Sequence, residues 1–241
     1  MNLSQGMFLC AGLSTRMRPL TDELPKVLLP LGRKTIFEWA CDYFESQQIE
    51  KIAVNIHHGA QTFHNFLAAH DFNQEIHTFD EEIILGTGGA VKNMQAFVSQ
   101  DHFFVMNCDV VTDVDLQRMY QYHIEKKALA TLLIMPNPNK KYTPIYLNAH
   151  QNIESILSPK TRHDDMGMFG GVTIFSKDIF AHMPLEKEFC LVRHLLEPLC
   201  KNKENIVGYK SSERWLDTGE IDLYNFAIKE MTDKPLSWMK E

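Results

Sequence analysis

The 241-residue sequence has no run of eighteen apolar residues and no basic segment that leads into a long apolar stretch at its start. We therefore expect neither a membrane span nor a secretion signal. The formal net charge is −7, so no general positive field would attract a polyanion, and an anion site must be a local group of lysines and arginines. We expect no nucleic-acid partner and no membrane partner.

Cysteine is scarce, with five residues that are odd in number, far apart and without a CxxC pair. This pattern argues against a disulfide framework and against a zinc site. It predicts reduced, mostly buried thiols in a cytoplasmic protein. The sequence also has no internal repeat, no low-complexity tract and no linker, so we expect one domain over residues 1–241.

Strand-like and helix-like segments alternate over the first half of the chain. We expect strands at 6–10, 51–56, 75–79 and 102–107, and helices at about 36–44, 60–69, 91–98 and 116–123. A possible capping box, Thr35 with Glu38, precedes the first helix. Such alternation predicts an α/β fold, with a Rossmann-like and mostly parallel sheet flanked by helices.

The pattern changes after Ala128. Four strand-like segments follow, ALATLLIM, TPIYLN, NIESIL and GGVTIF, with no good helix between the first three. This arrangement is typical of an antiparallel extension. Apolar stripes at 189–199 and 224–231 then predict helices. We therefore expect one α/β domain with a strand-rich insertion.

The first candidate site is the segment FLCAGLSTRMRPLTDELPKVLLPLG, Phe8 to Gly32, whose prolines exclude a regular helix. Its small residues would let backbone N–H groups approach an anion, and Arg16 and Lys26 could neutralise phosphate oxygens. The small residues are Ala11, Gly12, Ser14 and Thr15. The spacing fits neither GxGxxG nor GxxxxGK[ST]. The segment predicts a triphosphate site in which Lys26 is an exposed loop lysine that contributes little to stability, and the alternative is a solvated, basic surface loop.

Two acids and a glycine-rich segment follow other predicted elements. Asp109 comes directly after a strand, and Asp217 lies in RWLDTGE before a helix. Together they could hold one Mg²⁺, which prefers oxygen ligands, although an acid at either place could also be a helix cap or turn residue. In LGTGGAVK the glycines Gly86, Gly88 and Gly89 would permit close approach of a flat ligand, or serve only a flexible turn.

Taken together, these segments resemble the sugar-1-phosphate nucleotidyltransferases, also called nucleoside-diphosphate-sugar pyrophosphorylases. The family's opening motif is met by Leu9–Gly12, Ser14, Arg16, Pro19–Thr21 and Pro25–Lys26. The similarity continues at Leu85–Lys92, Asn107–Asp109, Gly170–Val172, Phe189–Leu199 and Trp215–Ala227. By its length and by VVTD, the chain is most similar to a short bacterial branch. That branch includes N-acetylmuramate-1-phosphate uridylyltransferase and the mannose-1-phosphate and heptose-1-phosphate guanylyltransferases.

The resemblance implies a GT-A-like fold with a nucleotide-binding part at about 1–127 and 205–231 and a sugar-side part at about 128–204. It implies Mg²⁺-dependent transfer of a nucleoside monophosphate from a nucleoside triphosphate to a sugar 1-phosphate, in cell-envelope carbohydrate metabolism, by a monomer or homodimer. It assigns Arg16 and Lys26 to catalysis on the phosphates, Asp109 and Asp217 to the metal, and Gly171 to the sugar. The nucleotide-binding set is Leu9, Ala11, Gly12, Leu13, Ser14, Thr15, Gly86, Thr87, Gly88 and Asn107.

The sequence departs from the family pattern at four places. Ser14 and Cys108 stand where glycines are usual, DTGE replaces the usual D-I-G-T, and LSPK at Leu157–Lys160 replaces a Glu-Lys-Pro motif near the sugar. The base and the sugar stay open, with UTP or GTP ahead of CTP or dTTP. Two alternatives also stay open: a phosphocholine cytidylyltransferase-like enzyme, and a nucleotide-binding regulatory protein without catalysis.

Overall fold

The computed structural model describes residues 2–137, 141–156 and 166–239, which form two compact units. The N-terminal unit contains Asn2–Ile84, Asn107–Val114 and the segment from Glu213 onward. The central unit contains Leu85–Met106 and Asp115–Ser212.

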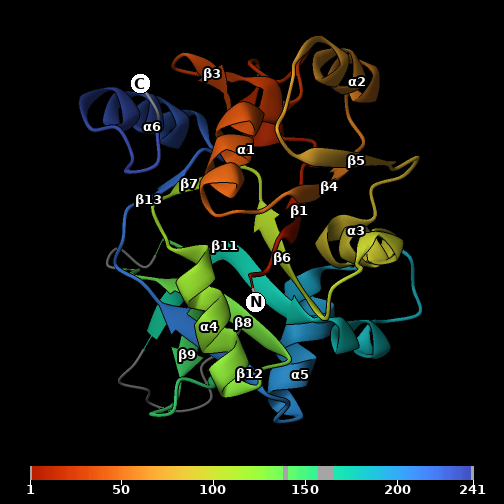
Figure 1. Cartoon of the computed structure of the whole chain (residues 1–241), viewed down its shortest axis with the longest axis vertical. Coiled ribbons are helices and arrows are strands. Elements are labelled where there is room, and N and C mark those ends of the chain that lie inside the picture. The colour runs from red at the N-terminus through yellow and green to blue at the C-terminus, as the bar shows by residue number, and fades with distance from the viewer. Residues whose placement is uncertain (1, 138–140, 157–165, 240–241) are drawn as a thin grey trace. The chain divides into compact units, whose positions relative to one another are not determined.

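Three parallel strands form the sheet of the N-terminal unit. Strand β4 (Lys51–Ile56) lies between β1 (Gln5–Leu9) and β5 (Glu75–Asp80), with Leu9 opposite Asn55 and Asn55 opposite Phe79 (Figure 1). All five residues of β4 after Lys51 are buried, as expected for a strand covered on both faces. The carboxyl ends of these strands share one edge, where ligands of open α/β sheets bind.

Two helices connect these strands, α1 (Ile36–Ser46) and α2 (Ala60–Ala69). The predicted capping box before α1 is confirmed, because the Thr35 hydroxyl accepts the Glu38 N–H and the Glu38 carboxylate accepts the Thr35 N–H. Phe8 of β1 lies 4.3 Å, ring to ring, from a phenylalanine of α1, so the helix packs on the sheet through aromatic contacts.

A second core in the same unit joins segments far apart in the sequence. The segment between β1 and β2 (Pro30–Leu31), which contains Arg16 and Lys26, is called the cationic loop below. Its residue Met17 packs with residues of α1 and α6 (Ile221–Asp233). The same core includes residues of the hairpin of β2 and β3 (Lys34–Thr35), and of the strands β7 (Val110–Thr112) and β13 (Trp215–Asp217). Met17 is fully buried in this cluster. The apolar packing therefore anchors the loop to β7, β13 and α6.

The central unit contains a mixed sheet. Strand β11 (Met166–Ser176) pairs antiparallel with β6 (His102–Asn107), β8 (Ala130–Met135) and β9 (Pro144–Leu147). Strand β9 pairs antiparallel with β10 (Ile153–Ser155), and β12 (Ile206–Lys210) runs parallel to β8. The helices of this unit are α3 (Gly86–Asn93), α4 (Leu116–Lys126) and α5 (Glu197–Lys201), the last preceded by a π-helical turn at Val192–Leu196.

The predicted α/β fold with a mostly parallel sheet and an antiparallel extension is confirmed. Both boundaries of the helix predicted at 91–98 were wrong: α3 begins at Gly86 and ends at Asn93, and a short 3-10 turn follows at Gln95–Phe97. Of the five cysteines, all free, three are buried, Cys10 is half-buried and Cys190 is exposed. No helix in the described residues is long and apolar enough to cross a membrane.

A pair of histidines, of which one is buried, connects α4 to β6 of the central unit. His123 is fully buried, its Nδ1 is 2.8 Å from the Thr131 hydroxyl, and its Nε2 is 3.1 Å from Nδ1 of His102. Burial, and to a lesser degree the neighbouring His102, lowers the pKa of His123 from 6.5 to about 3. His123 is therefore neutral in the folded protein.

This pKa predicts a loss of stability in acid. The unfolded chain protonates His123 below pH 6.5 whereas the folded chain does so only near pH 3, so its contribution is complete above pH 6.5 and falls as the pH drops. We expect wild type to lose about 1.4 kcal/mol per pH unit more than His123→Gln between about pH 6.5 and about pH 5. Urea unfolding of both proteins at several pH values measures this difference, and parallel pH profiles would contradict it.

Candidate active site

The cationic loop is held in a defined conformation by its own backbone. It contains two short 3-10 turns, Thr15–Met17 and Lys26–Leu28. The carbonyl of Ser14 accepts the Met17 N–H at 2.9 Å and the Thr21 hydroxyl at 3.0 Å. The loop is therefore not a disordered basic surface segment, although its tip residues are exposed.

Ser14 has φ 50° and ψ 35°, which is the left-handed region. This is the position where the resembling family usually has glycine, and glycine adopts that conformation without the Cβ penalty of about 1–2 kcal/mol. Serine thus keeps the loop conformation at some cost in strain. The Ser14 hydroxyl donates a 3.3 Å hydrogen bond to the Gly12 carbonyl, in addition to the two hydrogen bonds that the Ser14 carbonyl accepts.

The ribbon of β7 and β13 brings the two predicted metal acids together. Asp217 lies opposite Val110 in the antiparallel register, so it is next to Asp109 across the ribbon. Beyond the last strand pair, the Thr218 N–H and hydroxyl both donate to the Asp109 carbonyl, at 3.0 and 2.9 Å. The backbone around both acids is therefore fixed by strand pairing that continues past the carboxylates.

The acids and Arg16 converge on one point beside Gly219. A Cβ atom placed on Gly219 would lie 2.9 Å from Asp217 Oδ1, 3.5 Å from Asp109 Oδ2 and 3.5 Å from Arg16 Nη2. The Gly219 N–H donates to Asp217 Oδ1 at 2.7 Å and so orients that carboxylate. Glycine at this position leaves the space between the three charged groups open.

Two ion pairs lie in this cluster. Lys26 Nζ donates to Asp109 Oδ2, and Arg16 Nη1 donates to Glu220 Oε1 at 2.6 Å. The Lys26 side chain is 15% exposed, so the expected exposed loop lysine was wrong; it is drawn inward by Asp109, whose side chain is 23% exposed. Arg16 is 68% exposed and can turn towards solvent or a ligand.

The donor set fits Mg²⁺ bound together with substrate phosphates. Mg²⁺ usually takes one or two carboxylates plus phosphate and water oxygens, and two carboxylates face one open point here. In the described part of the chain, no group of three or more His, Cys, Asp or Glu side chains is arranged to hold a metal. The chain thus offers a two-carboxylate site rather than an all-protein cage.

The remaining predicted nucleotide residues of the N-terminal unit follow two strand ends. Leu9 ends β1 and Asn107 ends β6. Of the others, Ala11 is buried, whereas Gly12, Leu13 and Thr15 are exposed at the loop tip. They lie at the ligand-binding edge of the sheet, and their contact with a nucleotide stays a prediction.

In the central unit, the glycines of the LGTGGAVK segment pack against the chain itself. Gly88 and Gly89 donate their N–H groups to the Phe189 carbonyl, and the Thr87 hydroxyl accepts the Leu191 N–H at 2.9 Å. A Cβ on Gly88 would come within 2.2 Å of the Phe189 ring. Close approach of this segment explains the glycines, so a role of Gly86, Thr87 and Gly88 in base binding stays a prediction.

Gly171 also has a structural role. It has φ 77° and lies where the pairing of β11 with β8 shifts register between Phe169 and Thr173. A positive φ of this kind is typical of a β-bulge, where glycine is favoured. Its predicted contact with the sugar is untested, and the LSPK segment, Leu157–Lys160, lies outside the described residues.

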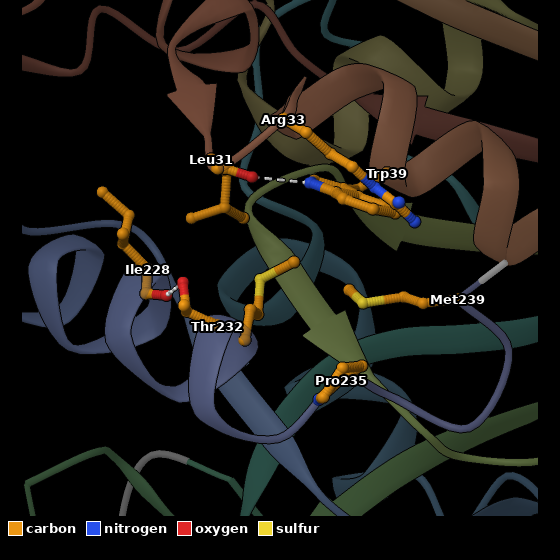
Figure 2. A pocket seen from close by; sticks show the side chains of 9 residues that line it. Leu31, Arg33, Trp39, Ile228, Thr232, Pro235 and Met239 are labelled. Carbon is orange, nitrogen blue, oxygen red and sulfur yellow. Dashed lines mark hydrogen bonds between the residues drawn. The ribbon is translucent and has the colours of Figure 1, made fainter. Parts of the chain in front are cut away.

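An apolar cavity of about 360 Å³ lies elsewhere in the N-terminal unit (Figure 2). It is lined by Leu31, Gly32, Arg33, Trp39, Ile228, Met231, Thr232, Pro235 and Met239. None of these is a charged residue of the Gly219 cluster. Among these lining residues Trp39 is the one aromatic, and the cations of Arg33 and Lys34 lie 5.5 and 5.4 Å from its ring centre. The cavity therefore lacks the aromatic cage that a choline group would favour.

Sequence reasoning missed several residues of the site. Glu220 was noted as a departure from the family pattern but not as the partner of Arg16, 204 residues away. Thr218 fixes the Asp109 backbone, and Asn55 and Glu81 form a buried hydrogen bond at the sheet edge. For Asn55 and Glu81, the sequence signal was their position at the ends of predicted strands.

The fold and this site define a class of protein. A parallel sheet with two acids and two cations gathered at one open point has the groups that proteins use to position phosphates and a divalent cation. The chain belongs to the nucleotidyl transferase family, whose sequence pattern matches residues 5–234.

The relatives carry names of sugar-1-phosphate nucleotidyltransferases. D-glycero-alpha-D-manno-heptose 1-phosphate guanylyltransferase of Aneurinibacillus thermoaerophilus is 27% identical over 228 residues, which is 94% of this chain and 98% of that protein. UTP--glucose-1-phosphate uridylyltransferase of Synechocystis sp. is 24% identical over 249 residues. The matched region is 96% of this chain and 64% of that protein. The resemblance stated from the sequence motifs is thus confirmed.

A solved structure shows the same fold. HddC from Yersinia pseudotuberculosis, complexed with GMP-PN, superposes with a TM-score of 0.80 at 20% identity and covers 95% of this chain and 100% of that chain. The two chains therefore share their architecture over almost their whole length.

The Lys26–Asp109 pair predicts a double effect of Lys26→Ala. Turnover should fall by several orders of magnitude because a cation at the phosphates is lost. Folding stability should also fall, by about 1–2 kcal/mol, because a half-buried Asp109 carboxylate is left without its partner. Steady-state kinetics and urea unfolding measure the two effects.

A second variant separates these effects. Adding Asp109→Asn to Lys26→Ala removes the unpaired charge and should restore most of the stability while turnover stays lost. Normal turnover in Lys26→Ala, or an equal loss of stability in the double variant, would contradict the role given to this ion pair.

Proposed function

We propose that the protein transfers a nucleoside monophosphate from a nucleoside triphosphate to a sugar 1-phosphate, with release of pyrophosphate and with Mg²⁺ as cofactor. The observation that carries this proposal is the convergence of Asp109, Asp217 and Arg16 on one open point, with Lys26 on Asp109. The named activities of the relatives support it.

The chemistry needs positioning rather than a strong base. The nucleophile is a phosphate oxygen of the sugar 1-phosphate, which is already anionic, and it attacks the α-phosphorus in line with the departing pyrophosphate. The obstacle is repulsion between two anions that must come within bonding distance. Catalysis then depends on orientation and on neutralising charge as it develops.

The charged cluster would provide both orientation and charge neutralisation. Asp109 and Asp217 would hold Mg²⁺, which supplies charge neutralisation to the reacting phosphates. Lys26, already a partner of Asp109, would transfer its hydrogen bond to a phosphate oxygen when the triphosphate is bound. Arg16 would leave Glu220 and hold the leaving pyrophosphate with two hydrogen bonds of its guanidinium.

For the nucleobase, we propose GTP first and UTP second. Full-length guanylyltransferase relatives support GTP, since this chain covers 98% and 99% of two of them. Backbone groups of Leu9–Gly12 would read the base edge, and the sugar would meet the central unit near Gly171. Because backbone contacts are rigid, we expect a strong preference for one base. Because LSPK replaces the Glu-Lys-Pro motif, we expect looser discrimination among sugar 1-phosphates.

The proposal extends to the setting of the enzyme. Free cysteines and a nucleoside triphosphate substrate favour the cytoplasm, and the names of the bacterial relatives favour a role in cell-envelope carbohydrate metabolism. A monomer or a homodimer would serve the reaction equally. The phosphocholine alternative is tested directly by the substrate grid.

A substrate grid tests the proposed function. We expect pyrophosphate release with GTP or UTP and at least one sugar 1-phosphate, and a kcat/KM for other bases lower by about tenfold or more, since unpaired polar groups cost about 1–3 kcal/mol each. Phosphocholine with CTP is included as a pair. Turnover of that pair alone, or nucleotide binding by calorimetry without any turnover, would contradict the proposal.

The metal assignment predicts that Asp109→Asn abolishes turnover while the protein stays folded, and that excess chelator does the same to wild type. Asp113→Asn is the matched control, because Asp113 lies at the other end of β7 and accepts the Ser237 N–H and hydroxyl, which an asparagine oxygen can also do. Full activity of Asp109→Asn, or an equal loss in Asp113→Asn, would refute the assignment.

A further inference from the structure

A chain of hydrogen bonds connects the ends of β1, β4 and β5 in the N-terminal unit. The backbone N–H of Cys10 donates to Asn55 Oδ1 at 2.7 Å, and Asn55 Nδ2 donates to Glu81 Oε1 at 2.7 Å. Asn55 is 4% exposed and Glu81 is 7% exposed. Buried polar groups in such a chain are held tightly, because losing one bond leaves its partners unsatisfied.

The orientation of Asn55 follows from its neighbours. The Cys10 N–H can only donate, so the amide oxygen must face it, and the amide nitrogen then faces the Glu81 carboxylate. Glu81 is also fixed by its backbone, since its N–H donates to Ile56 at 2.7 Å and its carbonyl is 2.8 Å from His57 Nδ1. Asn55 is therefore a rigid support rather than a mobile surface amide.

The contact lies where the sheet ends and the loop begins. Leu9, the last residue of β1, is opposite Asn55 in the parallel register, and Cys10 follows directly. The Asn55 side chain thus adds one hydrogen bond beyond the backbone pairing of β1 with β4. This bond holds Cys10, the first residue of the cationic loop. The next residues, Ala11 and Gly12, are the ones proposed to face the base.

We propose that Asn55 and Glu81 are positioning residues for the nucleotide. Through Cys10 they set the direction in which the backbone leaves β1, and so they fix where the N–H and carbonyl groups of Ala11 and Gly12 meet the base edge. This inference rests on the proposed function for the identity of the ligand. The hydrogen bond from the Cys10 N–H to Asn55 does not depend on the proposed function.

The test compares Asn55→Ala with two other variants in the full chain. Glu81→Gln keeps an oxygen that can accept from Asn55, and Gln74→Ala removes a buried amide that donates to the Cys41 carbonyl at 2.7 Å, away from the loop. Binding of a non-hydrolysable GTP analogue, and of a UTP analogue, is measured by calorimetry. KM is then measured for the triphosphate and for the sugar 1-phosphate.

We expect Asn55→Ala to weaken analogue binding, and to raise the triphosphate KM, by about tenfold or more, with the sugar 1-phosphate KM unchanged. Glu81→Gln should stay near wild type. Gln74→Ala should lower the melting temperature without changing nucleotide affinity. Unchanged affinity in Asn55→Ala, or an equal loss in Gln74→Ala, would overturn the proposal.

Amide hydrogen exchange provides a readout that does not depend on activity. The Cys10 amide should be protected in wild type and in Glu81→Gln, and should lose protection in Asn55→Ala, or in Asn55→Ser if the alanine variant does not fold. Protection that persists in those Asn55 variants would refute the bond. Absence of turnover in wild type with every substrate pair would refute the proposed function while leaving this measurement intact.

Discussion

The site depends on one constraint: two carboxylates that repel each other are held side by side. Strand pairing between β7 and β13 holds the two acids in place. The two hydrogen bonds from Thr218 to the Asp109 carbonyl extend that pairing past the acids. Lys26 pairs with Asp109 and so reduces the repulsion between the carboxylates, whereas Arg16 pairs with Glu220. The same cations are then available to phosphates.

The second core of the N-terminal unit makes this arrangement rigid. Met17 lies one residue after Arg16 and is fully buried with residues of β7, β13 and α6. Tyr224 of α6 and Trp39 of α1 belong to the same cluster, so the loop, the ribbon and both helices are stabilised together. An apolar cluster thereby sets the distance between cations and acids that lie far apart in the sequence.

The sequence predicted what depends on local pattern and motif spacing. Alternating strands and helices, the Thr35–Glu38 capping box and the boundaries of α2 all follow from periodicity and local hydrogen bonding. The start of α3 was misplaced because glycines are poor helix formers, and the close approach of Phe189 and Lys187 explains them. The candidate residues of the site were named from motifs, but their contacts depend on tertiary structure.

Long-range pairs could not be read from one sequence. Nothing near Arg16 indicates Glu220, and nothing near Cys10 indicates Asn55, because each contact exists only after the strands and the ribbon have formed. Lys26 was expected in solvent for the same reason. Charge pairing over large sequence separations therefore defines the part of the site that only the structure shows.

A crystal structure with a non-hydrolysable GTP analogue and Mn²⁺ in place of Mg²⁺ tests the central claim most directly. We expect an anomalous peak coordinated by both Asp109 and Asp217, with Lys26 Nζ moved from Asp109 to a phosphate oxygen. A metal bound away from both acids, or a triphosphate bound while Lys26 still pairs with Asp109, would contradict it.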